Sequence, residues 1–191
     1  MIYQIEMLEL CALGLLQREP VHGYRLKQDL ELFMSSCLSV NYGAIYPLLH
    51  RLEERGYIDS SIEESPESGS SRKTYNVTPE GQARWQTLMA QQPRDSWVNS
   101  RSRFMVKFFF FRDIDPQLRL KLLKARIRAC EERQDLVYSQ EFGSDAYQQA
   151  AWERHLQMLM GELHWLQDQL NREQGQQSPD TQESSSNHAI H

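Results

Sequence analysis

Apolar residues recur at helical spacing in three segments of the N-terminal half, which predicts three amphipathic helices. After Gly56, a residue type that commonly ends helices, apolar positions alternate in residues 57–62 and 72–77 and predict two strands joined by a Ser/Gly-rich turn. Three helices followed by a β-hairpin are the element order of a winged helix-turn-helix. The helical stripes are Ile5, Leu8, Ala12, Leu15 and Leu16, then Leu26, Leu30 and Phe33, and then Ile45, Leu48, Leu49 and Leu52.

The third predicted helix carries Gly43, Tyr46, His50 and Arg51 on the face opposite its apolar stripe. A winged helix-turn-helix most often reads DNA, and such a face suits a helix lying in the major groove. On an ordinary amphipathic helix the same residues would face only solvent. Pro47 lacks an amide hydrogen and crowds the carbonyl of residue 43, so we expect this helix to begin irregularly or to bend.

Two cations, Arg72 and Lys73, come directly after the turn of the predicted hairpin. Long cationic side chains at this place in a wing can reach backbone phosphate, although ordinary surface charge would look the same. After the second strand, the run Thr78–Pro79–Glu80 predicts a further helix, because it combines an N-cap, a first-turn proline and a carboxylate near the positive end of the helix dipole.

Three stretches resemble the N-terminal domain of PadR-family transcriptional regulators: LELCALGLLQREPVHGYRLKQDLE, YGAIYPLLHRLEERGYIDSS and SRKTYNVTPEGQ. The resemblance covers roughly residues 4–90 and is carried by His22-Gly23-Tyr24, by Tyr46-Pro47 with Arg51-Leu52-Glu53, and by Arg72-Lys73-x-Tyr75. The rest of the chain is similar in layout to the longer, virulence-activator type of this family, which has a helical C-terminal domain. The resemblance implies a dimeric DNA-binding regulator, often a repressor, and some members of the family respond to phenolic acids or drugs.

The expected partners are double-stranded DNA with a pseudo-palindromic operator, a second copy of the chain and, as a further candidate, a small aromatic effector. The alternative is a winged helix that has lost DNA binding and docks on proteins. Tyr24 could brace a phosphate or simply pack between helices. The residues expected at DNA are Tyr24, Lys27, Asn41, Tyr42, Gly43, Tyr46, His50, Arg51, Arg72 and Lys73.

The C-terminal half contains two heptad-spaced apolar stripes, at 120–137 and 152–170, which predict an antiparallel helical hairpin. Asp115–Pro116 is expected to begin the first helix, and the run from Phe142 to Asp145 to end it and start the second. The hairpin could close within one chain, but stripes this regular more often pair between chains. The residues expected to form the dimer are Leu120, Leu123, Ile127, Trp152, Leu156, Leu159, Leu163 and Leu166.

The predicted fold class is therefore mainly α with a small β-wing. We expect a winged helix-turn-helix domain over residues 1–92, an antiparallel, coiled-coil-like dimerisation domain over 93–173, and a disordered tail over 174–191. The tail is rich in Gln, Ser and Asp and cannot bury enough apolar surface to order itself. A chain of 191 residues that is 40% hydrophobic can bury a core of this size.

The net charge of −5 lowers the expectation of tight non-specific binding to nucleic acid. Positive charge must then be local, concentrated where Lys27, Arg51, Arg72 and Lys73 share one surface and doubled by dimerisation. A second cationic stretch, with Arg94, Arg101, Arg103, Lys107 and Arg112, follows the predicted module.

Other chemistry finds little support in the sequence. A phosphate-binding glycine loop and a G-x-S-x-G nucleophile motif are missing, so we expect neither an enzyme nor a cofactor. His155 and His164 lack ligands at metal-binding spacing, and Cys37 is expected to be a structural thiol rather than a redox switch. Three widely spaced cysteines, an N-terminus without a basic signal region and no apolar run of about 18 residues point to the cytoplasm.

The aromatic run from Phe108 to Phe111, with Trp97 and Phe104, could line an effector pocket. The alternative is a packed core, which we favour because aromatic side chains at such density usually pack on one another.

Overall fold

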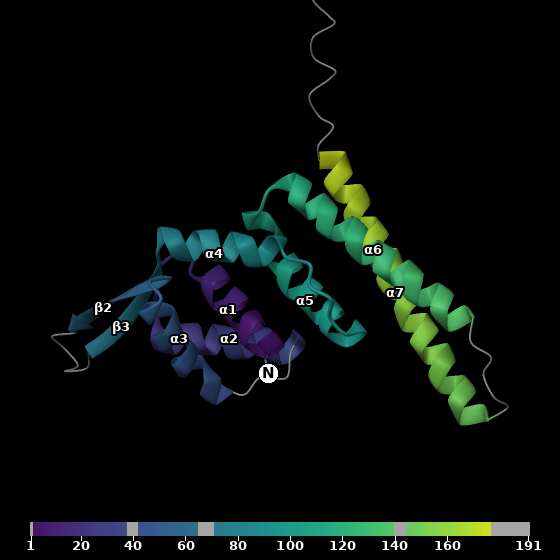
Figure 1. Ribbon diagram of the computed structural model, residues 1–191, viewed down its shortest axis with the longest axis horizontal. Helices are drawn as coiled ribbons and strands as arrows, with labels where there is room; N and C mark the ends of the chain where they lie inside the picture. Colours follow the sequence, from purple (N-terminus) through teal and green to yellow (C-terminus); the bar gives the residue numbers. More distant parts are fainter. Residues whose placement is uncertain (1, 38–41, 65–70, 140–144, 177–191) are drawn as a thin grey trace, which may run out of the picture. The chain divides into compact units, whose positions relative to one another are not determined.

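The structure is a computed structural model that describes residues 2–37, 42–64, 71–139 and 145–176 (Figure 1). Its contacts divide the chain into two units, residues 1–113 and residues 114–191. Each unit is described by itself. The expected disorder of the tail lies outside the described residues from 177 onward, and so does the expected helix stop at Phe142–Gly143.

The first unit confirms the predicted order of helices and strands of a winged helix-turn-helix, with two additions. A short strand precedes the second helix, and another helix follows the fourth. Its elements are α1 (Ile2–Leu15), β1 (Val21–His22), α2 (Gly23–Cys37), η1 (Tyr42–Ala44), α3 (Ile45–Glu54), β2 (Ile58–Glu64), β3 (Ser71–Val77), α4 (Pro79–Ala90), α5 (Trp97–Phe109) and η2 (Phe111–Asp113).

The sheet has three antiparallel strands in the order β1-β3-β2. β2 and β3 form the predicted hairpin, with Ser60 opposite Tyr75. β1 adds to the other edge of β3, where Val21 lies opposite Tyr75 and His22 opposite Thr74. The sequence pattern predicts a turn at this place, because a strand of two residues is too short to show alternation and is defined only by its partner.

α1 is buried on all its sides along Met7–Leu13, where relative exposure ranges from 0% to 3%. A single apolar stripe is therefore a wrong description of this helix, and Ile5 from the expected stripe is partly exposed. The reason is that α2, α3, α4 and α5 all contact α1. α1 is thus the centre of the unit, and the other helices cover it (Figure 1).

The predicted local signals at both ends of α3 are confirmed. A short 3-10 turn precedes α3, which is the irregular start expected from Pro47. At the other end, Gly56 has a φ of 71° and its amide donates to the Glu53 carbonyl at 2.9 Å. The side chain of Thr78 then caps α4 by accepting a hydrogen bond from the Gly81 amide. These turns fix the angle between α3 and the wing.

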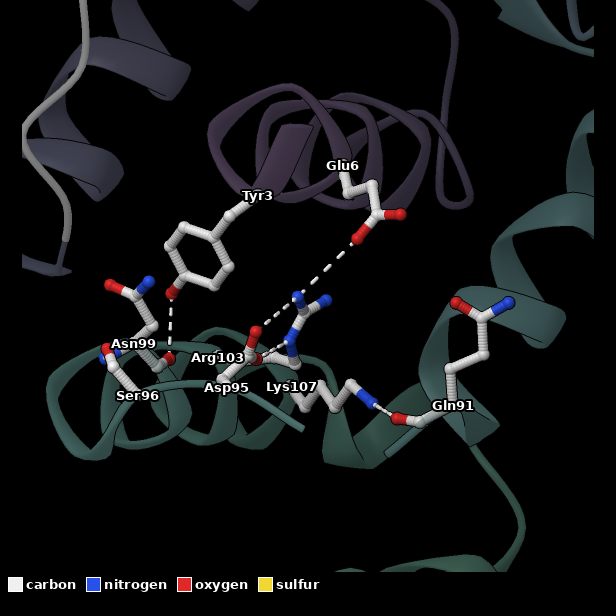
Figure 2. A network of polar contacts seen from close by, with 8 residues as sticks. All are labelled: Tyr3, Glu6, Gln91, Asp95, Ser96, Asn99, Arg103 and Lys107. Atoms are coloured by element: carbon white, nitrogen blue, oxygen red, sulfur yellow. Dashed lines mark hydrogen bonds and ion pairs between the residues drawn. The ribbon is translucent and has the colours of Figure 1, made fainter. Parts of the chain in front are cut away.

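α5 belongs to the first unit because a network of charged groups ties it to α1 and to the end of α4 (Figure 2). The Arg103 guanidinium lies 2.6 Å from Asp95 and 3.5 Å from Glu6. The ammonium of the buried Lys107 donates to the Gln91 carbonyl, just after α4. The contacts accordingly divide the chain after Asp113, later than the domain boundary expected between residues 92 and 93.

The second unit consists of α6 (Pro116–Tyr138) and α7 (Ala146–Gln176), which pack side by side (Figure 1). The predicted N-cap at Asp115 is confirmed, and Asp145 likewise accepts from the first amides of α7. Arg119 pairs with Glu173 and Arg126 with Glu162, so later residues of α6 meet earlier residues of α7. The helices are therefore antiparallel, as the heptad stripes predict.

Candidate nucleic-acid interface

A groove with a volume of about 720 Å³ opens on the first unit where β1, α2, α3 and β3 meet. Four separate elements supply its walls, so the groove exists only in the folded unit. Its lining residues are His22, Gly23, Tyr24, Arg25, Tyr46, Lys73 and Tyr75.

Two tyrosines give the groove an exposed aromatic rim. Tyr24, at the start of α2, is 69% exposed, and Tyr46, in the first turn of α3, is 50% exposed. The Tyr24 hydroxyl accepts a hydrogen bond from the Gln28 side chain at 3.1 Å. This exposure does not fit the reading of Tyr24 as a side chain packed between helices. Tyr75, by contrast, is buried and forms the floor.

Lys73 supplies a cation at the wing side of the groove and is held by a carboxylate of α3. Its ammonium lies 2.8 Å from Glu53 and 5.1 Å above the ring of Tyr75. The hydroxyl of Ser60, on β2, donates to the other carboxylate oxygen. These hydrogen bonds, first from Lys73 and then from Ser60, lower the pKa of Glu53, and the bond to Glu53 raises the pKa of Lys73.

Other basic side chains near the groove also lie beside carboxylates of the same chain. Arg25 lies 3.6 Å from Glu19 and 3.7 Å from Asp29. Elsewhere on the helices, Lys27 lies 3.5 Å from Glu31, and His50 lies 3.4 Å from Glu54. This surface therefore carries several basic groups, but the carboxylates beside them offset much of their positive charge. This agrees with the acidic composition of the chain.

The structure brings three of the expected DNA-contacting residues into one groove: Tyr24, Tyr46 and Lys73. Gly43 and His50 are exposed on the α3 side, whereas Arg51 is half-buried and does not face fully outward as its spacing suggests. Lys27 lies on α2 outside the groove lining. Asn41 and the side chains of Tyr42 and Arg72 lie outside the described part of the chain.

The groove also contains residues that sequence reasoning did not select as site residues: His22, Gly23, Arg25 and Tyr75. The Nδ1 of His22 lies 2.7 Å from the Thr74 hydroxyl, which ties β1 to β3 beside the groove. Among these residues, His22, Gly23 and Tyr75 carry a sequence signal, as parts of the motifs that carry the family resemblance. The role of Glu53 as the partner of Lys73 joins residues far apart in sequence, and no local pattern marks it.

Most rings of the aromatic run pack together, as the core interpretation predicts, but Phe109 is 49% exposed. The ring centroids of Phe104, Phe108 and Phe111 lie 4.7–6.1 Å apart, and Phe110 meets Trp85 edge-on at 6.0 Å. These rings therefore contact one another and Trp85 of α4. The arrangement favours a structural role for the run over an effector pocket.

Within the described ranges, no group of three or more His, Cys, Asp or Glu side chains is arranged to hold a metal ion. Cys11 and Cys130 are buried, and the side chain of Cys37 lies outside the described part. None of the helices in residues 2–37, 42–64, 71–139 and 145–176 is long and apolar enough to cross a membrane.

Comparison with known proteins identifies the first unit. Residues 12–87 match the model of the transcriptional regulator PadR-like family. A PadR-like transcriptional regulator from Bacillus cereus shares 32% sequence identity, over 42% of this chain and 76% of that chain, with a TM-score of 0.36. The search of curated proteins finds no match.

Two other solved structures match over almost their whole length at lower identity. One is Bacillus subtilis PadR in complex with operator DNA, at 20% identity over 87% of this chain and 98% of that chain, with a TM-score of 0.44. The other is a second PadR-like regulator from Bacillus cereus, at 20% identity over 88% and 99%, with a TM-score of 0.40. The family match over the winged-helix region and the sequence shared there show that this chain belongs to the PadR-like family of transcriptional regulators.

Proposed function

We propose that this protein is a sequence-specific DNA-binding regulator that acts as a homodimer on a pseudo-palindromic operator in the cytoplasm. The observation that carries the proposal is the groove lined jointly by Tyr24, Tyr46 and Lys73. The start of α2, the recognition helix α3 and the wing thus form one surface. A winged helix needs this arrangement to contact base edges and phosphates together.

Each element has a distinct role in this proposal. α3 and the preceding turn η1 enter the major groove and present Gly43, Tyr46 and His50, and the wing places Lys73 at a backbone phosphate. Tyr24 lies at the N-terminal end of α2, where free amides and the helix dipole also favour a phosphate. Phosphate contacts fix the register of the protein, and α3 supplies the sequence preference.

The α6–α7 hairpin supplies the dimer in this proposal, and the structure divides the eight expected dimer residues into two sets. Leu123, Leu159, Leu163 and Leu166 are buried within the single chain. The other four, Leu120, Ile127, Trp152 and Leu156, remain half-exposed in the single chain and are the better candidates for contact with a second copy.

Binding to DNA is tested with the purified full chain and duplexes from the region upstream of its own gene. We expect tight binding to one or more of these duplexes and a steep loss of affinity as salt rises, because phosphate contacts release counterions. Lys73→Met should weaken binding to all sequences, whereas the matched control Lys124→Met, an exposed lysine on α6, should not. A chain that binds none of the duplexes and also selects nothing from random duplexes would instead be a protein-interaction module.

The role of α3 is tested by His50→Ala. Loss of a base contact costs about 1–3 kcal/mol at one base position and relaxes specificity there. A uniform loss over all sequences would make His50 a phosphate contact.

The dimer is tested by Leu156→Glu with Gln157→Glu as its control, because Gln157 is the exposed neighbour on the same helix. Sedimentation should show a monomer for the first variant and a dimer for the second. The monomer should lose most operator affinity, because linking two half-site contacts raises the effective concentration of the second. A wild type that is already monomeric at micromolar concentration would contradict the proposal.

We also propose that the protein responds to a small aromatic effector, and this proposal rests on the family resemblance. Release of the operator duplex by a phenolic acid, at concentrations that leave the chain folded, would support it.

A further inference from the structure

The ion pair between Glu53 and Lys73 joins the recognition helix to the wing at the edge of the groove. Glu53 is near the C-terminal end of α3, and Lys73 is on β3. Lys73 lines the groove and also lies 2.8 Å from Glu53, so one ammonium faces both a carboxylate and the open space where a phosphate would enter.

This pair is built more firmly than the other ion pairs on this surface. Those of Arg25, Lys27 and His50 span 3.4–3.7 Å, against 2.8 Å for Lys73 and Glu53, and the side chains of all these pairs are exposed or partly exposed. Such pairs contribute little in water. Glu53, in contrast, also accepts a hydrogen bond from Ser60, which fixes the carboxylate in place from a third element.

The inference rests on the proposed function. We propose that Glu53 competes with DNA phosphate for Lys73: its carboxylate holds the ammonium in the free protein, and the ammonium is transferred to a phosphate in the complex. Glu53 then limits the affinity of the wing for DNA of any sequence, so that recognition depends more on α3.

Counterion exchange gives this competition a measurable signature. A lysine that neutralises one phosphate normally releases about 0.9 counterion from DNA, which adds that amount to the salt slope. Here the transfer leaves Glu53 without its partner, and the bare carboxylate attracts a cation from solution. A single carboxylate holds a cation far more weakly than the closely spaced phosphates of duplex DNA do, so this uptake offsets only part of the release, and the Lys73 contact adds less than about 0.9 to the salt slope of the wild type.

Glu53→Gln tests the competition, because glutamine keeps the length of the side chain and its ability to accept from Ser60 but carries no charge. We expect DNA of any sequence to bind about three- to fivefold more tightly, the range expected when a weak ion pair no longer opposes binding. The salt slope should become steeper by a fraction of the roughly 0.9 that one phosphate contact contributes.

The matched control is Asp59→Asn. Asp59 is exposed on β2 next to Ser60, and successive side chains of a strand point to opposite faces, so Asp59 points away from Glu53. This variant removes one carboxylate near the wing without freeing Lys73. We expect no change in the salt slope and a smaller gain in affinity than for Glu53→Gln.

Repeating both substitutions in a Lys73→Met background shows whether the effect passes through Lys73. There, Glu53→Gln should change affinity and slope no more than Asp59→Asn does. Equal effects of the two substitutions in the wild-type background, weaker binding by Glu53→Gln, or a gain that persists without Lys73 would each overturn the inference. Thermal unfolding of every variant checks that the wing is intact.

The failure of this inference is distinguishable from failure of the proposed function. Wild-type protein that binds no DNA refutes the proposed function whatever the variants do. Wild-type protein that binds DNA, with a Glu53→Gln variant that behaves like Asp59→Asn, refutes only the competition.

Discussion

The two units of this protein bury their helices in different ways. In the first, α1 is covered on every side by four other helices. In the second, α6 and α7 pack against each other, and Leu123 and Leu166 are buried while Trp152 and Leu156 remain half-exposed. A core enclosed by four helices covers its apolar side chains, whereas a two-helix hairpin leaves some of them partly exposed, and the proposed dimer would bury these.

The two units also use buried charge differently. In the first unit, Arg103 and Lys107 tie three elements together at the edge of the core (Figure 2). In the second, one pair between Arg126 and Glu162 crosses the seam of two helices, and both side chains are nearly buried. A polar pair inside an apolar seam fixes the register of the helices more than it adds stability.

Removing α5 should have the largest effect. A fragment of residues 1–113 should fold cooperatively, whereas a fragment of residues 1–90 should not, because it lacks Phe110 and Arg103 and exposes one side of α1. Circular dichroism with chemical denaturation measures this directly. A sharp unfolding transition in the shorter fragment would show that the module is complete without α5.

Arg126→Met should destabilise the hairpin by about 3–5 kcal/mol, because it leaves the Glu162 carboxylate in a desolvated seam without its partner. Denaturant unfolding followed by tryptophan fluorescence provides the free energy. The double variant Arg126→Met with Glu162→Met should recover most of the loss. A double variant as unstable as the single one would mean that the pair contributes more than the fixing of register.

Gly14→Ala in α1 should cost about 2 kcal/mol of unfolding free energy through overpacking. A Cβ at this position would lie 2.6–2.9 Å from the ring of Phe110, which is 1% exposed and packed against Trp85. Differential scanning calorimetry of Gly14→Ala measures this loss of stability. The double variant Gly14→Ala with Phe110→Leu should recover part of it. Full stability in the single variant would mean that α5 moves easily on α1.

Lys107→Met should alter the pH dependence of stability. Burial lowers the pKa of Lys107 to about 8 from the model-peptide value of 10.5. Between these values the unfolded chain binds more protons than the folded chain, so the unfolding free energy of the wild type should rise with pH. We expect a rise of about 1–2 kcal/mol from pH 7 to 10 in the wild type, and a flatter profile in the variant.

The pH range of this measurement matters, because burial raises the pKa of Tyr3, in the same network, to about 12. Above pH 10 the folded chain retains the tyrosine proton that the unfolded chain loses, so stability falls with pH and opposes the lysine effect. Identical profiles for Lys107→Met and the wild type below pH 10 would contradict the assignment to Lys107.

Gly161→Ala in α7 should have the smallest effect, and the opposite sign to Gly14→Ala. Both glycines lie inside helices, but a Cβ at Gly161 would meet nothing within 4 Å. Alanine should therefore stabilise the hairpin by about 0.5–1 kcal/mol through helix propensity alone. Destabilisation by Gly161→Ala would contradict this expectation.

The sequence by itself determined most of the elements and several of their ends, but neither β1 nor α5. The irregular start of α3, the glycine that ends it, and the caps at Thr78, Asp115 and Asp145 all follow from interactions within a few residues, which a local pattern records. Motifs such as His22-Gly23-Tyr24, whose residues line the groove, also indicated the correct family.

Only the tertiary structure decided which elements belong together. β1 needs β3 as its partner, α5 needs α1, and Lys73 needs Glu53, each across a long stretch of chain. The burial of α1 on all sides and of one stripe of α7 also depends on which surfaces meet. Long-range pairing leaves no periodic trace in the sequence, because each partner keeps the same local pattern whether or not the other is present.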